Sequence, residues 1–368
     1  MYLKNLKLSN FKNYSAADIT FNKKINCFTG DNGAGKTNIL EALYYLSFCK
    51  SYFNSSDTQN IKHGSGFFAI HGTYINKDNS EDKVSVIQKK GKKKQVKFNG
   101  KEYAKLAGHI GKIPLVMVSP YDRDLINDGS EIRRKYIDGV ISQFDKIYLN
   151  NLLEYNKALQ QRNRLLKYFG ENGIFDVTSL SVWDNALISR GIDLYEKRKK
   201  FLAEFNPLFE EYYRYLSDGN EKVKIEYVSQ LHNENFNDLL LKVREKDRVL
   251  KYSTAGVHKD DLIFTINGFP VKKFGSQGQQ KTFVIAVKLA QFEFTRRKKG
   301  FKPVLLFDDI FDKLDDKRVS KIMELTGNDD FGQVFITDTQ KERISKMFGN
   351  NNIQHKIFSV KNGTVSEI

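Results

Sequence analysis

Apolar and polar positions at the start of the chain follow two different periods. Apolar side chains alternate with polar ones at Leu3, Leu6 and Leu8, and the run 25–28 leads into a glycine-rich stretch, which predicts strands. Residues 38–48 instead place apolar side chains three and four positions apart, which predicts a helix. A glycine-rich stretch separates the two patterns. The sequence therefore predicts a strand, a tight loop and a helix in succession.

The rest of the chain divides into three parts by pattern. Residues 61–118 have the alternation of strands, with a hairpin turning near Gly91. Residues from about 130 to 250 have helical spacing, for example at Tyr155, Leu159, Arg162 and Leu166, which is typical of a bundle core. These stripes are too short for long coiled-coil arms.

The last third returns to mixed structure. Strand-like runs at 262–266, 304–307 and 334–336 accompany a helical stretch from about 279 to 296. We therefore predict an α/β fold in which residues 1–118 and 250–368 form one split head with a β-rich subdomain. Residues 119–249 would then form a helical lobe inserted into it.

Composition narrows the class of protein. Lys plus Arg number 60 against 44 Asp plus Glu, giving a formal charge of +16, which favours nucleic acid or an acidic membrane surface as a partner. General lysine enrichment in an AT-rich genome is the alternative explanation. The two cysteines, Cys27 and Cys49, provide neither a metal-binding pattern nor a disulfide framework, which fits a reducing cytoplasm. The sequence has no signal-peptide pattern and no apolar run long enough to span a membrane, so we expect a cytoplasmic protein.

A phosphate-binding motif occupies the predicted strand–loop–helix. Residues 30–37 read GDNGAGKT and match G-x-x-x-x-G-K-[ST]. The glycines let backbone N–H groups face a phosphate, Lys36 supplies a positive charge, and the Thr37 hydroxyl can ligate magnesium. A structural glycine turn is the alternative. The expected ATP-binding residues are Gly30, Asp31, Asn32, Gly33, Ala34, Gly35, Lys36, Thr37 and Asn38.

An apolar strand ending in two acids lies near the other end of the chain. The run 304–307 is followed by Asp308 and Asp309, the arrangement of a Walker B strand. Asp308 would hold Mg²⁺ together with Thr37, and Asp309 would act as the catalytic general base toward water. Read alone, such a run also fits a solvated strand end, but the phosphate loop in the same chain favours the catalytic interpretation.

A third motif opens the helical stretch after residue 275 and resembles the S-x-G-Q signature of ABC ATPases. Its residues are Ser276, Gln277, Gly278 and Gln279. In that family the signature faces the ATP of a second subunit, so ATP joins two heads. An ordinary capping box, with Ser276 capping and Gln279 three residues on, is the alternative. Asp315 resembles the aspartate of a D-loop at the dimer interface, and Thr337 stands where transporters carry a switch histidine.

The resemblance becomes specific to the RecF family over nearly the whole chain. It rests on five stretches: 3–14 (LKNLKLSNFKNY), 120–138 (PYDRDLINDGSEIRRKYID), 159–167 (LQQRNRLLK), 256–262 (GVHKDDL) and 276–282 (SQGQQKT). The chain departs from the family pattern at Tyr121, where a Glu is usual, at Ser130 and Glu131, and at Asp312 and Lys313. The Tyr121 departure leaves the magnesium and water contact of the Q-loop region unassigned.

The resemblance implies a weak, DNA-stimulated ATPase that uses ATP and Mg²⁺. It implies an ATP-dependent homodimer that binds DNA at gaps or single-strand/double-strand junctions and, with RecR and RecO, helps to load RecA, with hydrolysis causing release. The nucleotide-binding subunit of an ABC transporter is the alternative, although the missing histidine and the positive charge count against it. An SMC-like DNA-bridging ATPase would need a longer coiled coil.

Lysines crowd the predicted hairpin tip and are the candidate DNA contacts. They are Lys89, Lys90, Lys92, Lys93 and Lys94. Such side chains bind phosphates without reading sequence, and their affinity depends on salt. A solvated lysine loop is the alternative. Arg133 and Arg134 would either contact DNA or pair internally.

Overall fold

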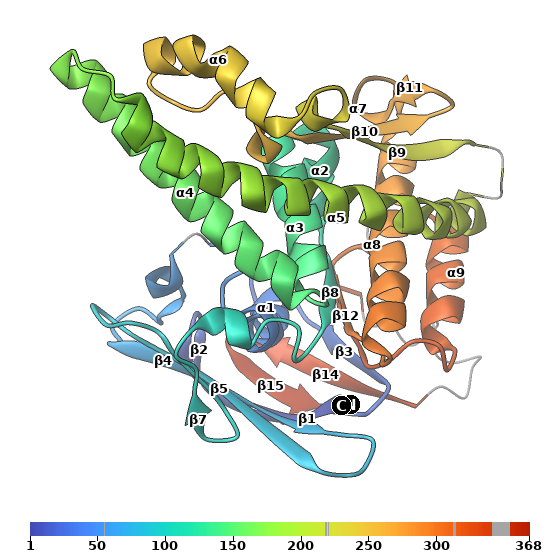
Figure 1. Ribbon diagram of the computed structural model, residues 1–368. Helices are drawn as coiled ribbons and strands as arrows, with labels where there is room; N and C mark the ends of the chain where they lie inside the picture. The colour runs from blue at the N-terminus through green and yellow to red at the C-terminus, as the bar shows by residue number, and fades with distance from the viewer. Residues whose placement is uncertain (55, 218, 220, 312–313, 341–353) are drawn as a thin grey trace. The chain divides into compact units, whose positions relative to one another are not determined.

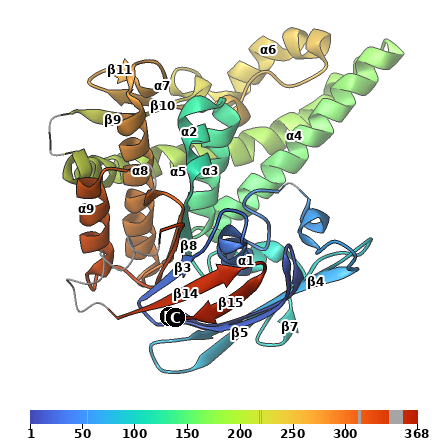
Figure 2. The same ribbon diagram turned by 180° about the vertical axis from the view of Figure 1, so that it is seen from behind.

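The computed structural model describes residues 1–368 except 55, 218, 220, 312–313 and 341–353 (Figures 1 and 2). The described chain forms two compact units, the first of Met1–Asp122 and Val287–Ile368 and the second of Arg123–Ala286. The second boundary thus differs from the one expected near residue 250. Strand β10 (Asp261–Ile266) accounts for the difference, because it pairs with β9 (Val223–Val228) and so joins the second unit.

The first unit contains two six-stranded sheets. One is antiparallel, in the order β2-β1-β4-β5-β6-β7, and the other is mostly parallel, in the order β15-β14-β3-β13-β12-β8. The antiparallel strands are β1 (Tyr2–Phe11), β2 (Tyr14–Thr20), β4 (Phe67–Ile75), β5 (Glu81–Lys89), β6 (Gln95–Phe98) and β7 (Lys101–Glu102). The other strands are β3 (Ile25–Thr29), β8 (Leu115–Val118), β12 (Val304–Asp308), β13 (Val334–Asp338), β14 (His355–Lys361) and β15 (Thr364–Glu367).

The centre of the parallel sheet is buried on both faces. Every residue of β3, β12 and β13 is buried, which explains why their sequences are mostly apolar and do not alternate. Helix α1 (Lys36–Phe48) contacts β4 and β5 of one sheet and β12 and β13 of the other. One apolar core therefore includes α1 and both sheets, and it fixes the start of α1 at the carboxyl end of β3.

Helix α9 (Asp316–Gly327) and the carboxyl-terminal part of α8 (Gln277–Lys299) complete the first unit. Both helices precede a strand of the parallel sheet, α8 before β12 and α9 before β13. Such helix–strand alternation is the rule for parallel sheets, which need crossover connections.

The second unit is mainly helical and carries a small antiparallel sheet in the order β11-β10-β9. Its remaining elements are α2 (Asp124–Asn127), α3 (Ser130–Ser142), α4 (Lys146–Asn172), α5 (Val177–Ser217), α6 (Phe236–Leu250), β11 (Phe269–Pro270), α7 (Val271–Phe274) and the start of α8. Helices α4 and α5 lie side by side in both views (Figures 1 and 2). No helix in the described ranges is long and apolar enough to cross a membrane.

An ion cluster lies inside the predicted helical stripe of α4. Arg162 has no exposed surface, and it bonds Asp184 of α5 through Nε and Asp247 of α6 through Nη1, each at 2.6 Å. Nη1 also donates to the Ser253 hydroxyl at 2.8 Å. A buried guanidinium requires such partners, so this arginine ties three segments of the unit together.

Candidate functional site

The phosphate loop joins β3 to α1 and depends on positive backbone angles. Gly30, Gly33 and Gly35 have φ values of 152°, 79° and 116°. A Cβ on Gly30 would lie 2.2 Å from the Val360 carbonyl oxygen. The loop is also supported from outside, because Asn13 Nδ2 donates to the Ala34 carbonyl at 2.9 Å. Glycine is therefore required for both conformation and space.

Lys36 extends across this loop. Its Nζ donates to the Gly30 carbonyl at 2.8 Å and to the Asp31 carbonyl at 3.1 Å, and the residue is only 4% exposed. Two neutral carbonyls do not cancel the charge of a buried ammonium. The cation is thus held over the loop, where a phosphate would supply the missing negative charge.

Two predicted metal ligands meet although they are far apart in sequence. Thr37 Oγ1 donates to Asp308 Oδ1 at 2.8 Å. Asp308 is the last residue of β12, and its position next to α1 follows from the sheet order β3-β13-β12. The structure therefore brings together the phosphate loop and the acid-tipped strand, as expected from the sequence.

Thr337 of β13 is a member of this cluster whose contacts the sequence did not predict. Its hydroxyl donates to Asp308 Oδ1 at 2.9 Å and accepts a bond of 2.9 Å from the Asp309 backbone N–H. From the sequence, this position was notable only because transporters have a histidine there and this chain has a threonine. The hydroxyl thus contacts the Asp308 carboxylate and the Asp309 backbone, and Asp309 itself has a positive φ of 44°. Such a conformation is costly for a residue with a side chain, so the local contacts must hold it in place.

The environment of Asp308 fits a divalent cation. The pKa of this carboxyl is raised to about 6, mainly by burial and also by the charge of Asp309, against the opposing effect of its hydrogen bonds from Thr37 and Thr337. A cation beside Asp308 would favour its charged form. Mg²⁺ takes carboxylate and hydroxyl oxygens and commonly uses one or two protein carboxylates together with phosphate oxygens. Thr37 and Asp308 supply that set.

The signature residues begin α8 in the second unit. Ser276 Oγ accepts from the Gln279 N–H at 3.2 Å, and Gln279 Oε1 accepts from the Ser276 N–H at 2.6 Å. The capping box that the sequence offers as an alternative is therefore present. It leaves Ser276 and Gln277 exposed at the start of a helix.

Asp315, the D-loop candidate, caps the next helix. Its side chain accepts from the backbone N–H of Arg318 at 2.9 Å at the start of α9. The departures at Asp312 and Lys313 lie outside the described residues. Asp315 is thus accounted for locally and is still exposed enough to meet a partner.

The lysine hairpin between β5 and β6 divides into two groups. Lys89, Lys90, Lys92 and Lys93 are exposed. Lys94 instead forms an ion pair with Asp57 and lies over the Tyr45 ring, so it differs from the other candidate DNA contacts. The side chain of Gln88 donates to the Lys89 and Lys92 carbonyls, which fixes the turn.

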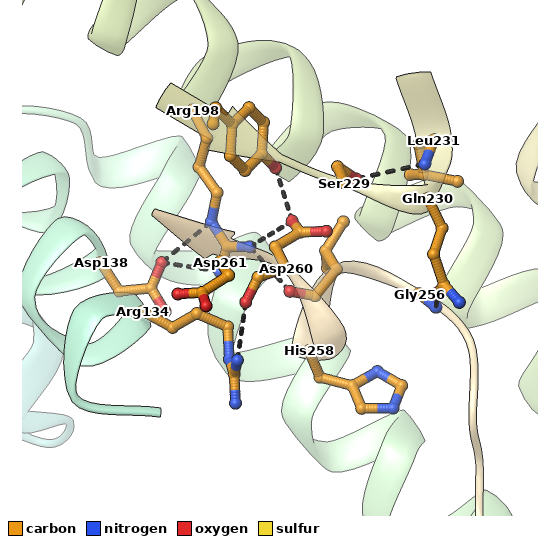
Figure 3. A network of polar contacts seen from close by, with 12 residues as sticks. Arg134, Asp138, Arg198, Ser229, Gln230, Leu231, Gly256, His258, Asp260 and Asp261 are labelled. Atoms are coloured by element: carbon orange, nitrogen blue, oxygen red, sulfur yellow. Dashed lines mark hydrogen bonds and ion pairs between the residues drawn. The ribbon is translucent and has the colours of Figure 1, made fainter. Parts of the chain in front are cut away.

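The two arginines of α3 are paired internally. Arg133 makes a two-pronged contact with Asp261, and Arg134 donates to the Asp260 carbonyl at 2.7 Å. Nearby, Arg198 joins Asp138 and Asp260, each at 2.8 Å (Figure 3). The sequence left Arg133 and Arg134 open between DNA and internal contacts, and the structure shows the internal ones.

Residues 256–262 form the centre of the network of polar contacts around Arg198. His258 accepts from the Tyr155 hydroxyl at Nδ1, at 2.8 Å, and donates from Nε2 to the Ser253 carbonyl at 3.2 Å. Gly256 has a φ of 122°, and a Cβ there would meet the Tyr155 hydroxyl at 2.6 Å. The stretch 256–262 is therefore a closely packed, hydrogen-bonded loop, and the sequence did not predict its contacts.

Tyr121, the residue that departs from the family pattern in the Q-loop region, is largely exposed. It is 63% exposed and packs on Phe53, with ring centroids 5.3 Å apart. Asp122 is buried instead, where it accepts from the Ser119 N–H at 2.7 Å and pairs with Lys288 of α8 at 2.6 Å. In this segment the buried polar side-chain contacts are therefore made by Asp122.

Comparison with known proteins identifies the family of this chain. The model of the "RecF/RecN/SMC N terminal domain" family matches residues 2–366. The DNA replication and repair protein RecF of Flavobacterium johnsoniae is 51% identical over 98% of this chain and 100% of its own length. That of Phocaeicola vulgatus is 48% identical over 100% and 98%. The chain belongs to the RecF family.

Solved structures support the same RecF fold. A structure described as the recombination mediator protein RecF-ATP in the RecFOR pathway aligns with a TM-score of 0.89 at 30% identity, covering 100% of this chain and 97% of that one. An Smc head domain of Pyrococcus furiosus aligns with a TM-score of 0.59 at 18% identity, covering 100% of this chain and 96% of that one, which shows a shared fold only. This RecF-family chain therefore has the ATPase-head architecture expected from its sequence.

Proposed function

We propose that this RecF-family protein is a DNA-repair ATPase that binds DNA as an ATP-dependent homodimer. The contact of Thr37 with Asp308 carries the proposal, because it joins the two halves of a nucleotide site across the sheet. The solved RecF-ATP structure supports ATP as the nucleotide. The net charge of +16 supports DNA as the partner.

Each residue of the site has one task in this proposal. Lys36 exchanges its two carbonyl partners for phosphate oxygens, and the N–H groups of residues 30–38 bind the same phosphates. Thr37 and Asp308 hold Mg²⁺, which would neutralise charge on the phosphates. Asp309 accepts the proton of the attacking water, and Thr337 keeps both acids oriented.

The signature supplies the second half of the nucleotide contact from another copy. Ser276 and Gln277 are exposed at a helix start, where backbone N–H groups favour an anion. ATP then holds two heads together, and hydrolysis releases them from DNA. The family resemblance extends this to gapped or junction DNA and to RecR, RecO and RecA.

The test uses Asp309→Asn, which removes the proposed base and keeps the size of the side chain. We expect this variant to bind ATP, to hydrolyse it at least about a hundredfold more slowly, and to elute as a dimer with ATP and Mg²⁺. Glu102→Gln, an exposed acid on β7, is the control and should behave as wild type. An Asp309→Asn variant that binds ATP and stays monomeric at every concentration would refute the shared site.

A further inference from the structure

A basic hollow lies at the amino ends of the strands of the parallel sheet, and the phosphate loop lies at their carboxyl ends. Its volume is about 810 Å³, and it is lined by residues that precede β3, β12 and β13, including Lys23, Lys302 and Gln333. The phosphate loop follows the carboxyl end of β3. The hollow is therefore separate from the nucleotide site, within the same unit.

Positive charge dominates the lining. Five cationic side chains border the hollow against one acid, Asp329; they are Lys23, Lys24, Lys77, Arg296 and Lys302. Two of the five have structural partners. Lys24 donates to the carbonyls of Asn328 and Phe331, and Arg296 makes a two-pronged contact with Glu293.

The other three lysines have no ion pair or side-chain hydrogen bond within the described part of the chain. They are Lys23, Lys77 and Lys302. Lys302 is near enough to Lys24 to contribute to the lowering of its pKa, after the larger effect of burial. Like charges that converge on one hollow repel each other, and an anionic ligand would relieve that repulsion.

The walls of the hollow are partly apolar. Ile75, Phe301 and Phe331 border it, and Phe331 stacks on Phe292 with ring centroids 4.5 Å apart. The volume falls in the range of sites that enclose a ligand group, about 300–1,000 Å³. Duplex DNA presents its phosphates on a wide convex surface and would contact the rim without filling this space. An apolar anchor carrying acidic neighbours fits the hollow better.

The ends of two helices favour a peptide over a polyphosphate as the ligand of the hollow. Helices α8 and α9 end at Lys299 and Gly327, and Gly300 and Gly327 line the hollow. The last carbonyls of a helix lack partners inside the helix, and although those of Arg296 and Leu325 accept from Gly300 and Asn328, a carbonyl oxygen can accept a second hydrogen bond. A polyphosphate or a DNA backbone offers only acceptors to these carbonyls. A peptide offers N–H donors to them and carboxylates to the lysines.

We propose that this hollow, bounded by Lys23, Lys77 and Lys302, is a docking site for an acidic segment of a partner protein that inserts one apolar side chain. The partner is recognised by alternating acids around that anchor. This site is independent of ATP and of the proposed dimer, since none of its residues belongs to the nucleotide site or to the signature.

The test measures fluorescence anisotropy of a labelled peptide of about ten residues, with Asp and Glu flanking a central Phe, against the full chain. We expect saturable binding that weakens with salt and falls about tenfold or more in Lys77→Glu/Lys302→Glu, since each reversal replaces an attraction by a repulsion. Lys101→Glu is the matched control, because Lys101 is an exposed lysine of β7 outside the hollow. It should change binding less than twofold.

Several results would overturn the proposal. They are equal losses in both variants, no saturable peptide binding, or equal binding of a peptide whose acids are replaced by amides. A single-stranded oligonucleotide of the same charge is the competing probe. If the hollow variant weakens the oligonucleotide and leaves the peptide unchanged, the site is a nucleic-acid site and the proposal fails. Should charge reversal prevent folding, Lys77→Gln/Lys302→Gln is measured instead, with a smaller expected loss of at least threefold.

Discussion

The buried imidazole of His258 gives a pH dependence of stability that can be worked out from its contacts. Its Nδ1 accepts from Tyr155 and its Nε2 donates to Ser253, so both nitrogens are satisfied in the neutral form. Burial, with a smaller contribution from the positive charges of Lys259 and Arg134, lowers the pKa of His258 from 6.5 to about 4. Protonation would leave Nδ1 facing a hydroxyl that can no longer donate to it.

The sign follows from the lowered pKa. The unfolded chain takes up the proton near pH 6.5 and the folded protein only near pH 4. The stabilisation is therefore complete above pH 6.5 and is lost as the pH falls through this window. Between pH 7 and pH 5 the free energy of unfolding should fall by about 2 kcal/mol from this one group.

The measurement compares wild type with His258→Gln by urea unfolding at both pH values. Glutamine can accept from Tyr155 and donate to Ser253, but it does not titrate. The chain has one tryptophan, Trp183, which lies on α5 in the same unit as His258, so its fluorescence reports the relevant transition. Other acids titrate in both proteins and cancel in the difference. If the stability difference between the two proteins is the same at pH 7 and pH 5, the buried neutral imidazole is refuted.

Two further predictions concern binding. Lys36→Ala should lower ATP affinity at least about a hundredfold, because it removes the buried cation over the phosphate loop. Calorimetry measures this affinity, with Lys101→Ala as the control. An unchanged ATP affinity would contradict the role of Lys36. Replacing Lys89, Lys90, Lys92 and Lys93 with Gln should flatten the salt dependence of DNA binding. The slope of log affinity against log salt concentration should fall in magnitude by about 0.9 per lost phosphate contact. Lys94→Gln should instead mainly destabilise the fold, through loss of the ion pair with Asp57. An unaltered slope in the fourfold variant places DNA elsewhere.

Local sequence order was enough to predict the strand, loop and helix of the candidate nucleotide site. The strand, loop and helix around Lys36 are contiguous, and the apolar run ending at Asp308 identifies its own strand. The helical period also placed Arg162 on the inner stripe of α4. Its partners Asp184 and Asp247 could not be predicted, because they depend on how α5 and α6 pack, and the period of one helix carries no information on that.

The boundary between the helical lobe and the head, expected near residue 250, was harder to predict for a similar reason. Whether β10 belongs with the sheets of the head or with the helical lobe depends on its pairing with β9, which is tertiary information. Thr337 illustrates the same limit within the site. Its position was recognised, but its bonds to Asp308 and Asp309 arise only when β13 lies between β3 and β12.

The order of strands around β3 affects how the protein emerges from the ribosome. Both neighbours of β3, β13 and β14, come from the last stretch of the chain, about 300 residues later. At bacterial elongation rates of roughly 5–20 residues per second, β3 stays unpaired on both edges for roughly 15–60 seconds. During that interval the second unit can fold by itself, while an apolar segment in the nascent head has open edges and is a natural client for a chaperone.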